Sequence, residues 1–246
     1  MKNNFSTIDE AICEYLDKCH AQVQTERGND YWAASSLGKC KRYQVMGKSG
    51  IITNGTTNYS WKNAAEDGHM GHAWRQHAMN HVGVLVDMEK PITNEELRYR
   101  GHYDMIVNLN GKLVLGDIKT QNNRAYKYRS NFPYRIDPYH ERQLGSYFYF
   151  LKNGDYPNLD SARLYYVNKN TGEREEFELF FTDDLFQSII AELKSLNWHW
   201  DNGILPKKEV SNFCRLCQFA PLCRALLNRK DTKIAHAIQR SLSETT

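Results

Sequence analysis

Hydrophobic residues recur along most of the chain with the spacing of either a helix or a strand. Between residues 7 and 24, a Thr-x-x-Glu capping box opens a stretch of apolar positions repeating every three to four residues, which predicts an amphipathic helix. Residues 63–81 lack proline and β-branched side chains and favour a second helix, despite two glycines. The same reasoning predicts strands at 82–88, 162–168 and 175–181, a hairpin at 99–120, and helices at 139–151 and 183–200.

Polar segments join these elements. Ser35 and Ser36 suit the start of a helix, residues 53–60 are rich in turn-forming side chains, and residues 229–246 form a polar tail. Strands that alternate with helices are typical of layered folds in which helices cover a sheet. The pattern therefore predicts an α/β (α+β) fold with helices packed on a central mixed sheet.

The hairpin carries charge within its strands. Asn110-Gly111 lies between two apolar runs, and both residues tolerate the positive φ angles of a type I′ turn. A two-residue loop fixes the register of the flanking strands. This register predicts three cross-strand pairs, which are Leu109 with Lys112, Asp104 with Asp117, and His102 with Lys119.

Two carboxylates that face each other in an apolar sheet repel, so they need a shared proton or a cation. Mg²⁺ and Mn²⁺ prefer carboxylate oxygens, and the pair of Asp104 and Asp117 therefore predicts a metal site. Lys119 lies two residues beyond Asp117, where its ammonium could hold an attacking water or stabilise charge on a phosphate oxygen. The alternative is a surface ion pair between Asp117 and Lys119 on an edge strand.

Composition narrows the class of protein. A chain of 246 residues with 41% hydrophobic residues can bury a sizeable core. No apolar run is long enough to span a membrane, and acidic residues interrupt the N-terminal stretch, so a cytoplasmic location without a membrane partner is expected. The net charge of +3 is too small to indicate nucleic-acid binding by itself. Six cysteines in a cytosolic chain favour metal binding or core packing over disulfides.

The carboxylate pair belongs to a longer series of motifs. "GHMGH" at 68–72 precedes Asp104, Asp-x-Lys follows at 117–119, and "QLGSY" stands at 143–147. In this order the four elements resemble the PD-(D/E)xK nuclease superfamily, and its RecB-like exonucleases in particular. The resemblance implies a restriction-endonuclease-like core.

The resemblance also implies roles for individual residues. Lys119 would position the nucleophile, Gln143 would orient Lys119 or the surroundings of the metal, and Tyr147 would approach the substrate strand. The implied ligands of a Mg²⁺ or Mn²⁺ ion are His72, Asp104, Asp117 and the backbone carbonyl of Ile118.

Other histidines compete with His72 for this role. His69, His77 and His81 lie in the same segment, and the last two have the i, i+4 spacing of zinc-binding helices. Most of these histidines should lie at the surface. His72 is preferred because Gly68 precedes it at the spacing of the motif.

Four cysteines form a second candidate site. Cys214, Cys217 and Cys223 form a C-x2-C-x5-C array that lacks one ligand of a tetrahedral site, and Cys40 could supply it. Spacing alone does not separate Zn²⁺ from a [4Fe–4S] cluster, and three core cysteines are the simplest alternative. The resemblance extends to Fe–S-containing AddB-type nuclease domains and CRISPR-associated exonucleases, and it favours a structural cluster.

These sites imply four regions along the chain. The expected division is an N-terminal helical segment at 1–62, a nuclease core at 63–200, a cysteine-cluster segment at 201–228 and a tail at 229–246. The cluster would join the N- and C-terminal segments.

Basic and aromatic residues alternate after Lys119. Cations can follow phosphates while rings stack on bases, a combination that suits single-stranded nucleic acid. The alternative is a polar loop whose rings pack back on the domain. The candidate DNA-binding residues are Arg124, Tyr126, Lys127, Tyr128, Arg129, Tyr134 and Arg135.

Together these features predict a metal-dependent exonuclease acting on single-stranded DNA ends. The chain lacks a P-loop motif and so has no helicase motor. It would act alone or with a helicase, recombinase or integrase. The alternative function is a non-catalytic Fe–S or zinc DNA-binding subunit of a larger complex.

Overall fold

A computed structural model describes residues 12, 14, 15, 30–49, 59–215 and 217–225 of the chain. Most of the helix predicted at 7–24 and the tail predicted at 229–246 lie outside these residues, as does most of the loop predicted at 53–60. Tyr59 and Ser60, which that loop included, are instead the first residues of a long helix.

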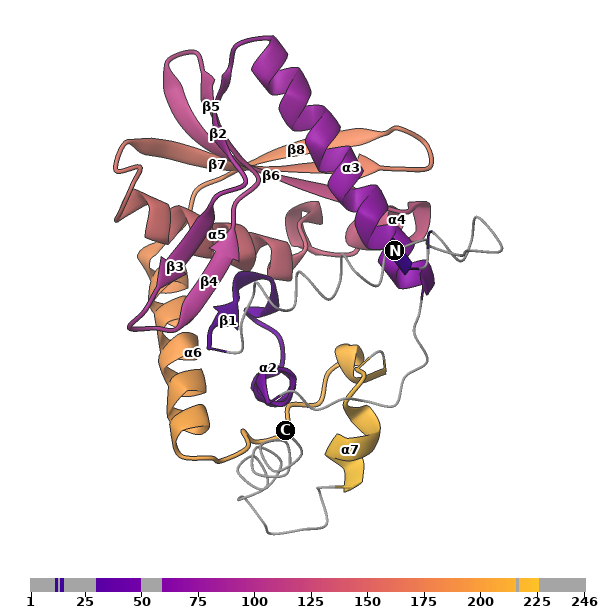
Figure 1. Cartoon of the computed structure of the whole chain (residues 1–246), viewed down its shortest axis with the longest axis vertical. Coiled ribbons are helices and arrows are strands. Elements are labelled where there is room, and N and C mark those ends of the chain that lie inside the picture. The colour runs from indigo at the N-terminus through magenta and orange to yellow at the C-terminus, as the bar shows by residue number, and fades with distance from the viewer. Residues whose placement is uncertain (1–11, 13, 16–29, 50–58, 216, 226–246) are drawn as a thin grey trace, which may run out of the picture.

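A five-stranded mixed sheet forms the centre of the molecule (Figure 1). Its order is β2-β5-β6-β7-β8, and β6 pairs in parallel with β7 while the other neighbours are antiparallel. The parallel pair requires a crossover, which helices supply. The strands are β2 Leu85–Met88, β5 Met105–Leu109, β6 Lys112–Gln121, β7 Leu159–Asn168 and β8 Arg174–Leu179.

Helices cover both faces of this sheet. One face packs Val107, Val114 and Ile118 against Met79 of α3, while the other face meets α5 and α6 in the larger core. This arrangement confirms the predicted fold class. The helices on the sheet and its crossover are α3 Tyr59–His81, α4 Asn123–Arg129, the 3₁₀ turn η2 Pro133–Arg135, α5 Pro138–Lys152 and α6 Asp183–Asp201.

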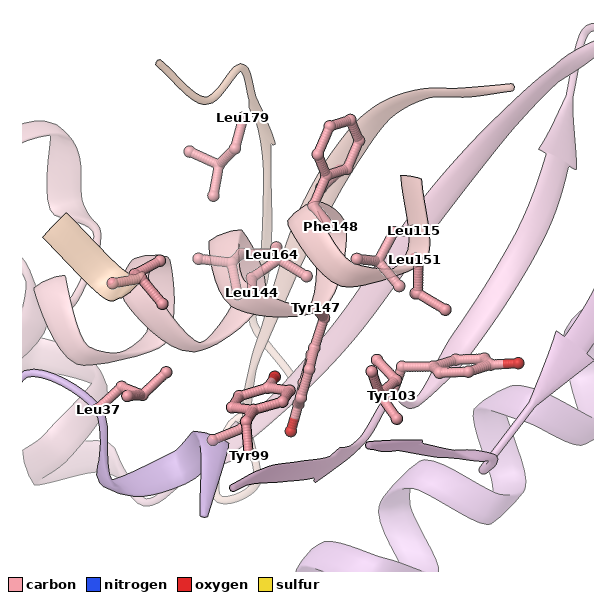
Figure 2. Packing of buried hydrophobic residues seen from close by; sticks show 14 of the residues in the cluster. Leu37, Tyr99, Tyr103, Leu115, Leu144, Tyr147, Phe148, Leu151, Leu164 and Leu179 are labelled. Atoms are coloured by element: carbon pink, nitrogen blue, oxygen red, sulfur yellow. The ribbon is translucent and has the colours of Figure 1, made fainter. Parts of the chain in front are cut away.

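The central helix α5 begins where its sequence dictates. The Asp137 side chain accepts a hydrogen bond of 2.9 Å from the backbone N–H of Tyr139, and Pro138 occupies the first turn, where no hydrogen bond is lost. Figure 2 shows the apolar side chains of α5 among those of the sheet. The labelled residues of α5 in that core are Leu144, Tyr147, Phe148 and Leu151.

A small three-stranded sheet, ordered β1-β4-β3, lies beside the large one. Its middle strand passes close to α5 at Gly101, where an added Cβ would lie 2.3 Å from Tyr147 Cε1. Only glycine therefore fits this crossing. The strands are β1 Trp32–Ala33, β3 Pro91–Asn94 and β4 Tyr99–His102.

The predicted hairpin is shorter than expected. Asn110 and Gly111 have φ angles of 54° and 84°, and Leu109 pairs with Lys112, as the turn required. The ladder ends one step before the aspartates, at Met105 and Gly116, so Asp104 and Asp117 do not form the predicted cross-strand pair. Residues 99–102 belong instead to the small sheet as β4, so the predicted pairing of His102 with Lys119 is wrong. Those residues pair with Pro91 and Tyr166 respectively, because the chain changes sheets at 103–104.

Helices α2 (Lys41–Lys48) and α7 (Ala220–Ala225) lie below the sheets in Figure 1. The helix expected to begin at Ser35-Ser36 is interrupted, since a 3₁₀ turn ends at Ser36 and α2 begins only at Lys41. None of the described helices is both long and apolar enough to cross a membrane. The elements here are η1 Ala34–Ser36, α2 Lys41–Lys48, η3 Asn212–Arg215 and α7 Ala220–Ala225.

Candidate active site

The central strand β6 carries three consecutive residues of the site. Side chains alternate along a strand, so Asp117 and Lys119 share one face while Ile118 packs into the core on the other. Lys119 Nζ lies 2.8 Å from Asp117 Oδ2, and both side chains are largely buried, at 16% and 1% exposed. Neither edge of the sheet is involved, which contradicts the alternative of an ion pair on an exposed edge strand.

Asp104 reaches this strand from the link between β4 and β5. Its Oδ2 accepts a hydrogen bond of 2.6 Å from the backbone N–H of Ile118 and lies 3.4 Å from Nδ1 of His72. Gln76, one turn after His72 on α3, donates a 2.9 Å hydrogen bond to the Asp104 backbone carbonyl. Of the four candidate histidines, His72 lies beside Asp104, whereas the side chains of His69, His77 and His81 are exposed.

Burial sets the protonation of the site. It raises the pKa of both Asp104 and Asp117 to about 6, although the positive charge of Lys119 opposes this rise. Burial lowers the pKa of His72, and Lys119 lowers it further. For Lys119 itself, the attraction of the two aspartates outweighs burial and raises the pKa. At neutral pH the site therefore holds two carboxylates, an ammonium and a neutral imidazole.

Helix α5 holds Lys119 in place. Lys119 Nζ donates a 3.0 Å hydrogen bond to Gln143 Oε1, and Gln143 Nε2 donates one of 2.8 Å to the Tyr147 hydroxyl. Tyr147 is only 3% exposed and lies against Gly101. Its clearest structural role is thus to fix Gln143, and through it the lysine.

A cleft of about 770 Å³ opens onto these residues. Helix α3 contributes His72 and Gln76 to its lining, α5 contributes Gln143, and the small sheet and α2 contribute further residues. Its lining also includes Glu89, which the sequence reasoning missed. One oxygen of Glu89, one of Asp104 and one nitrogen of His72 lie within 4.8 Å of one another.

The donor atoms suit a hard divalent cation. Asp117 Oδ1 is buried and accepts no hydrogen bond from the described residues, which is costly for a carboxylate unless an ion completes its surroundings. Asp104 offers a second carboxylate and His72 a neutral nitrogen. Oxygen donors with one imidazole accommodate Mg²⁺ or Mn²⁺.

Comparison with known proteins agrees with this geometry. The family model of the PD-(D/E)XK nuclease superfamily matches residues 9–224. The chain belongs to the PD-(D/E)XK nuclease superfamily. No curated protein matches the sequence.

Solved structures resemble this PD-(D/E)XK protein to different degrees, and one has a TM-score above 0.5. The crystal structure of SSO0001 has a TM-score of 0.57 at 18% identity, over 87% of this chain and 97% of that one. An alkaline exonuclease from Laribacter hongkongensis, LHK-Exo, has a TM-score of 0.44 at 12% identity, over 70% and 89%. The complex of LHK-Exo with dAMP has a TM-score of 0.45 at 13% identity, over 72% and 90%.

The PD-(D/E)XK core is flanked by the four predicted cysteines, which line one cavity of about 50 Å³. Cys40 comes from the residue before α2, and the other three come from the η3 and α7 segment. All four are free thiols. Burial raises the pKa of Cys217, and the charges of the three other thiols raise it further. Such mutual repulsion is relieved when thiolates share a cation.

The predicted DNA-binding loop of this nuclease-superfamily chain is instead largely helical, as α4 and η2. Asn122 caps α4 by accepting a 2.8 Å hydrogen bond from the backbone N–H of Ala125. Five of the seven candidate side chains are exposed, and two are buried. The exposed residues are Arg124, Lys127, Tyr128, Tyr134 and Arg135.

The predicted set of DNA contacts is wrong for Arg129 and Tyr126, because both side chains are buried. Arg129 is 1% exposed, its guanidinium lies 4.0 Å from the ring centroid of Tyr166, and it forms an ion pair with Glu175. Tyr126 is 8% exposed and also lies against this guanidinium. Arg129 needs its partner inside the protein because it is a buried cation, and Tyr126 packs against it. Neither side chain is therefore available to contact DNA.

Proposed function

We propose that this chain is a divalent-cation-dependent exonuclease that removes nucleotides from single-stranded DNA ends. The observation that carries the proposal is that Asp104 and Lys119 line one cleft, with the buried Asp117 paired to Lys119 behind it and Lys119 held by Gln143. Buried carboxylates of raised pKa beside a fixed ammonium are typical of catalytic sites. Membership of the nuclease superfamily supports phosphodiester hydrolysis as the reaction.

The cation would be held by side chains that already converge. Its proposed ligands are His72, Asp104, Asp117 and the backbone carbonyl of Ile118. When bound, Mg²⁺ or Mn²⁺ lowers the pKa of a coordinated water and neutralises charge on the phosphate. Two hydrogen bonds position Asp104 for this purpose. Its carboxylate accepts one from the backbone N–H of Ile118, and its backbone carbonyl accepts one from the side chain of Gln76.

Lys119 would act on the reacting atoms. Hydrolysis adds water across one P–O bond, so the water oxygen bonds to phosphorus while a proton is transferred to the leaving oxygen. The Lys119 ammonium stays protonated because Asp117 and Asp104 raise its pKa. It can therefore donate hydrogen bonds to the attacking water or to a non-bridging oxygen, whose negative charge grows in the transition state.

The exposed part of the α4 and η2 segment supports a single-stranded substrate. Tyr134 is 88% exposed and Tyr128 is 56% exposed, and both lie close in sequence to the exposed cations Arg124 and Lys127. Exposed rings can stack on unpaired bases while neighbouring cations contact phosphates.

For the cysteine site we propose a [4Fe–4S] cluster, with Zn²⁺ as the alternative. The four thiols converge from distant parts of the chain and are surrounded by Tyr43, Phe213 and Phe219, which would exclude solvent. Anaerobically purified protein should be brown and contain about four equivalents each of iron and sulfide. Colourless protein with one equivalent of zinc would overturn the cluster proposal.

The nuclease proposal is tested with end-labelled DNA. Wild-type protein with Mn²⁺ should release mononucleotides from single strands, and Lys119→Met should lose this activity. Lys194→Met removes an exposed lysine from α6 and serves as the control. Undegraded DNA with wild-type protein would refute the enzyme assignment, whereas internal cuts in circular single strands would refute the requirement for an end.

A further inference from the structure

Glu89 lies in the turn between β2 and β3, outside the motifs of the sequence analysis. We propose that Glu89 is a direct ligand of the divalent cation, together with His72 and Asp104; this inference rests on the proposed cation dependence of the same site. One donor atom from each of these residues lies within 4.8 Å of the other two, which is the spacing that ligands of one ion require.

The position of Glu89 is fixed by its neighbours. Gln76 Nε2 donates hydrogen bonds to Glu89 Oε1, at 2.6 Å, and to the backbone carbonyl of Asp104, at 2.9 Å. The Glu89 backbone N–H donates to the same carbonyl at 3.3 Å. A single amide side chain thus connects the turn that carries Glu89 to the link that carries Asp104.

The turn itself is anchored on its other side. Asp87 accepts hydrogen bonds from Tyr103, at 2.7 Å, and from Tyr156, and it lies 2.7 Å from Lys90 Nζ. Burial opposes ionisation of Asp87, but these hydrogen bonds outweigh it and hold the pKa at about 2. The turn is therefore bound to Tyr103, the residue immediately before Asp104, and Glu89 is presented to the site on a rigid support.

Charge distribution also favours an ion on this side of the site. Lys119 forms an ion pair with Asp117, whereas Asp104 Oδ2 lies 3.4 Å from His72 Nδ1 and Glu89 accepts a hydrogen bond from the uncharged amide of Gln76. Asp117 adds a second observation, since its buried Oδ1 accepts no hydrogen bond within the described residues. Three carboxylates and one ammonium leave a formal charge that one divalent cation would neutralise.

The test measures Mn²⁺ binding without DNA. Glu89→Gln keeps an oxygen that can accept from Gln76 but removes the charge, so the Kd for Mn²⁺, from calorimetry and the EPR signal of free Mn²⁺, should rise at least about tenfold. Glu96→Gln, an exposed residue of the β3–β4 turn, removes the same charge away from the cleft and should bind as wild type does. Wild-type affinity in Glu89→Gln would overturn the proposal.

A crystal of wild-type protein soaked in Mn²⁺ keeps the inference testable even if the variant does not fold. The anomalous signal of manganese should lie within roughly 2.0–2.6 Å of a Glu89 oxygen. An ion bound by Asp104 and Asp117 but remote from Glu89 would refute the inference. If wild-type protein cleaves DNA but Mn²⁺ binding does not depend on Glu89, this inference alone is refuted. Glu89-dependent binding without any cleavage would refute the proposed function alone.

Discussion

Asp117→Asn should stabilise the metal-free protein while abolishing its proposed activity. The substitution keeps the shape of the side chain and removes one buried charge. Asp117 is 1% exposed, and its Oδ1 accepts no hydrogen bond from the described residues. Lys119 partly compensates the charge at 2.8 Å, but burial outweighs this attraction. The metal-free site therefore stores unfavourable electrostatic energy that a cation would relieve.

The magnitude follows from the pKa of Asp117. A rise from 3.8 to about 6 corresponds to roughly 3 kcal/mol of unfavourable free energy for the ionised form. A carboxyl whose pKa is raised on folding favours the folded state at low pH, and this contribution is lost as the pH increases through about 6. Asparagine resembles the protonated form at every pH, so the variant should gain stability over wild type at pH 8 and little at pH 4.

Thermal unfolding in metal-free buffer measures this difference. For a chain of this length, roughly 3 kcal/mol corresponds to a rise in Tm of about 6–12 °C at pH 8. Asp155→Asn changes an exposed aspartate and should leave the Tm within about 1–2 °C. Mn²⁺ should raise the Tm of wild type but not of Asp117→Asn. A variant less stable than wild type at pH 8, or a difference that does not depend on pH, would refute the reasoning.

Three further predictions concern the site and its support. The Mn²⁺-induced rise in Tm of wild type should be largest at pH 8 and vanish by pH 5, because Asp104 and Asp117 take up protons near pH 6. A rise in Tm that does not change with pH would contradict their role as ligands. Arg129→Ala should lower the free energy of unfolding by about 2–5 kcal/mol in urea titrations, since it empties a buried position against Tyr166 and leaves Glu175 paired only with Arg135. A loss below about 1 kcal/mol would mean that the arginine is exposed. Gly101→Ala should lower the free energy of unfolding by about 1–3 kcal/mol, because the added methyl collides with the Tyr147 ring, and it should slow DNA hydrolysis. Gly68→Ala has no atom within 4 Å of its added Cβ, so it should change neither stability nor hydrolysis in this way.

Local sequence determined many of the helices and strands, and the register of the central hairpin next to its turn. Asn110-Gly111 demanded positive φ angles at two successive residues, and the pairing that follows from such a turn was observed up to Met105 and Gly116. The order of four short motifs indicated the nuclease superfamily, which the family model confirmed. These signals could be read from the sequence because each depends on residues close together in the chain.

Only the tertiary structure decided which side chains meet. The chain leaves one sheet for another at residues 103–104, so Asp104 is not part of a strand. Its side chain instead accepts a hydrogen bond from the backbone N–H of Ile118. Arg129 appeared to be a phosphate contact by composition, but Glu175, 46 residues later, pairs with it in the core. Glu89 belongs to no motif. It lines the cleft from the turn between β2 and β3, where its own backbone φ is 49°. Contacts between distant residues depend on how elements pack, and hydrophobic and polar spacing within one element carries no information about its partner.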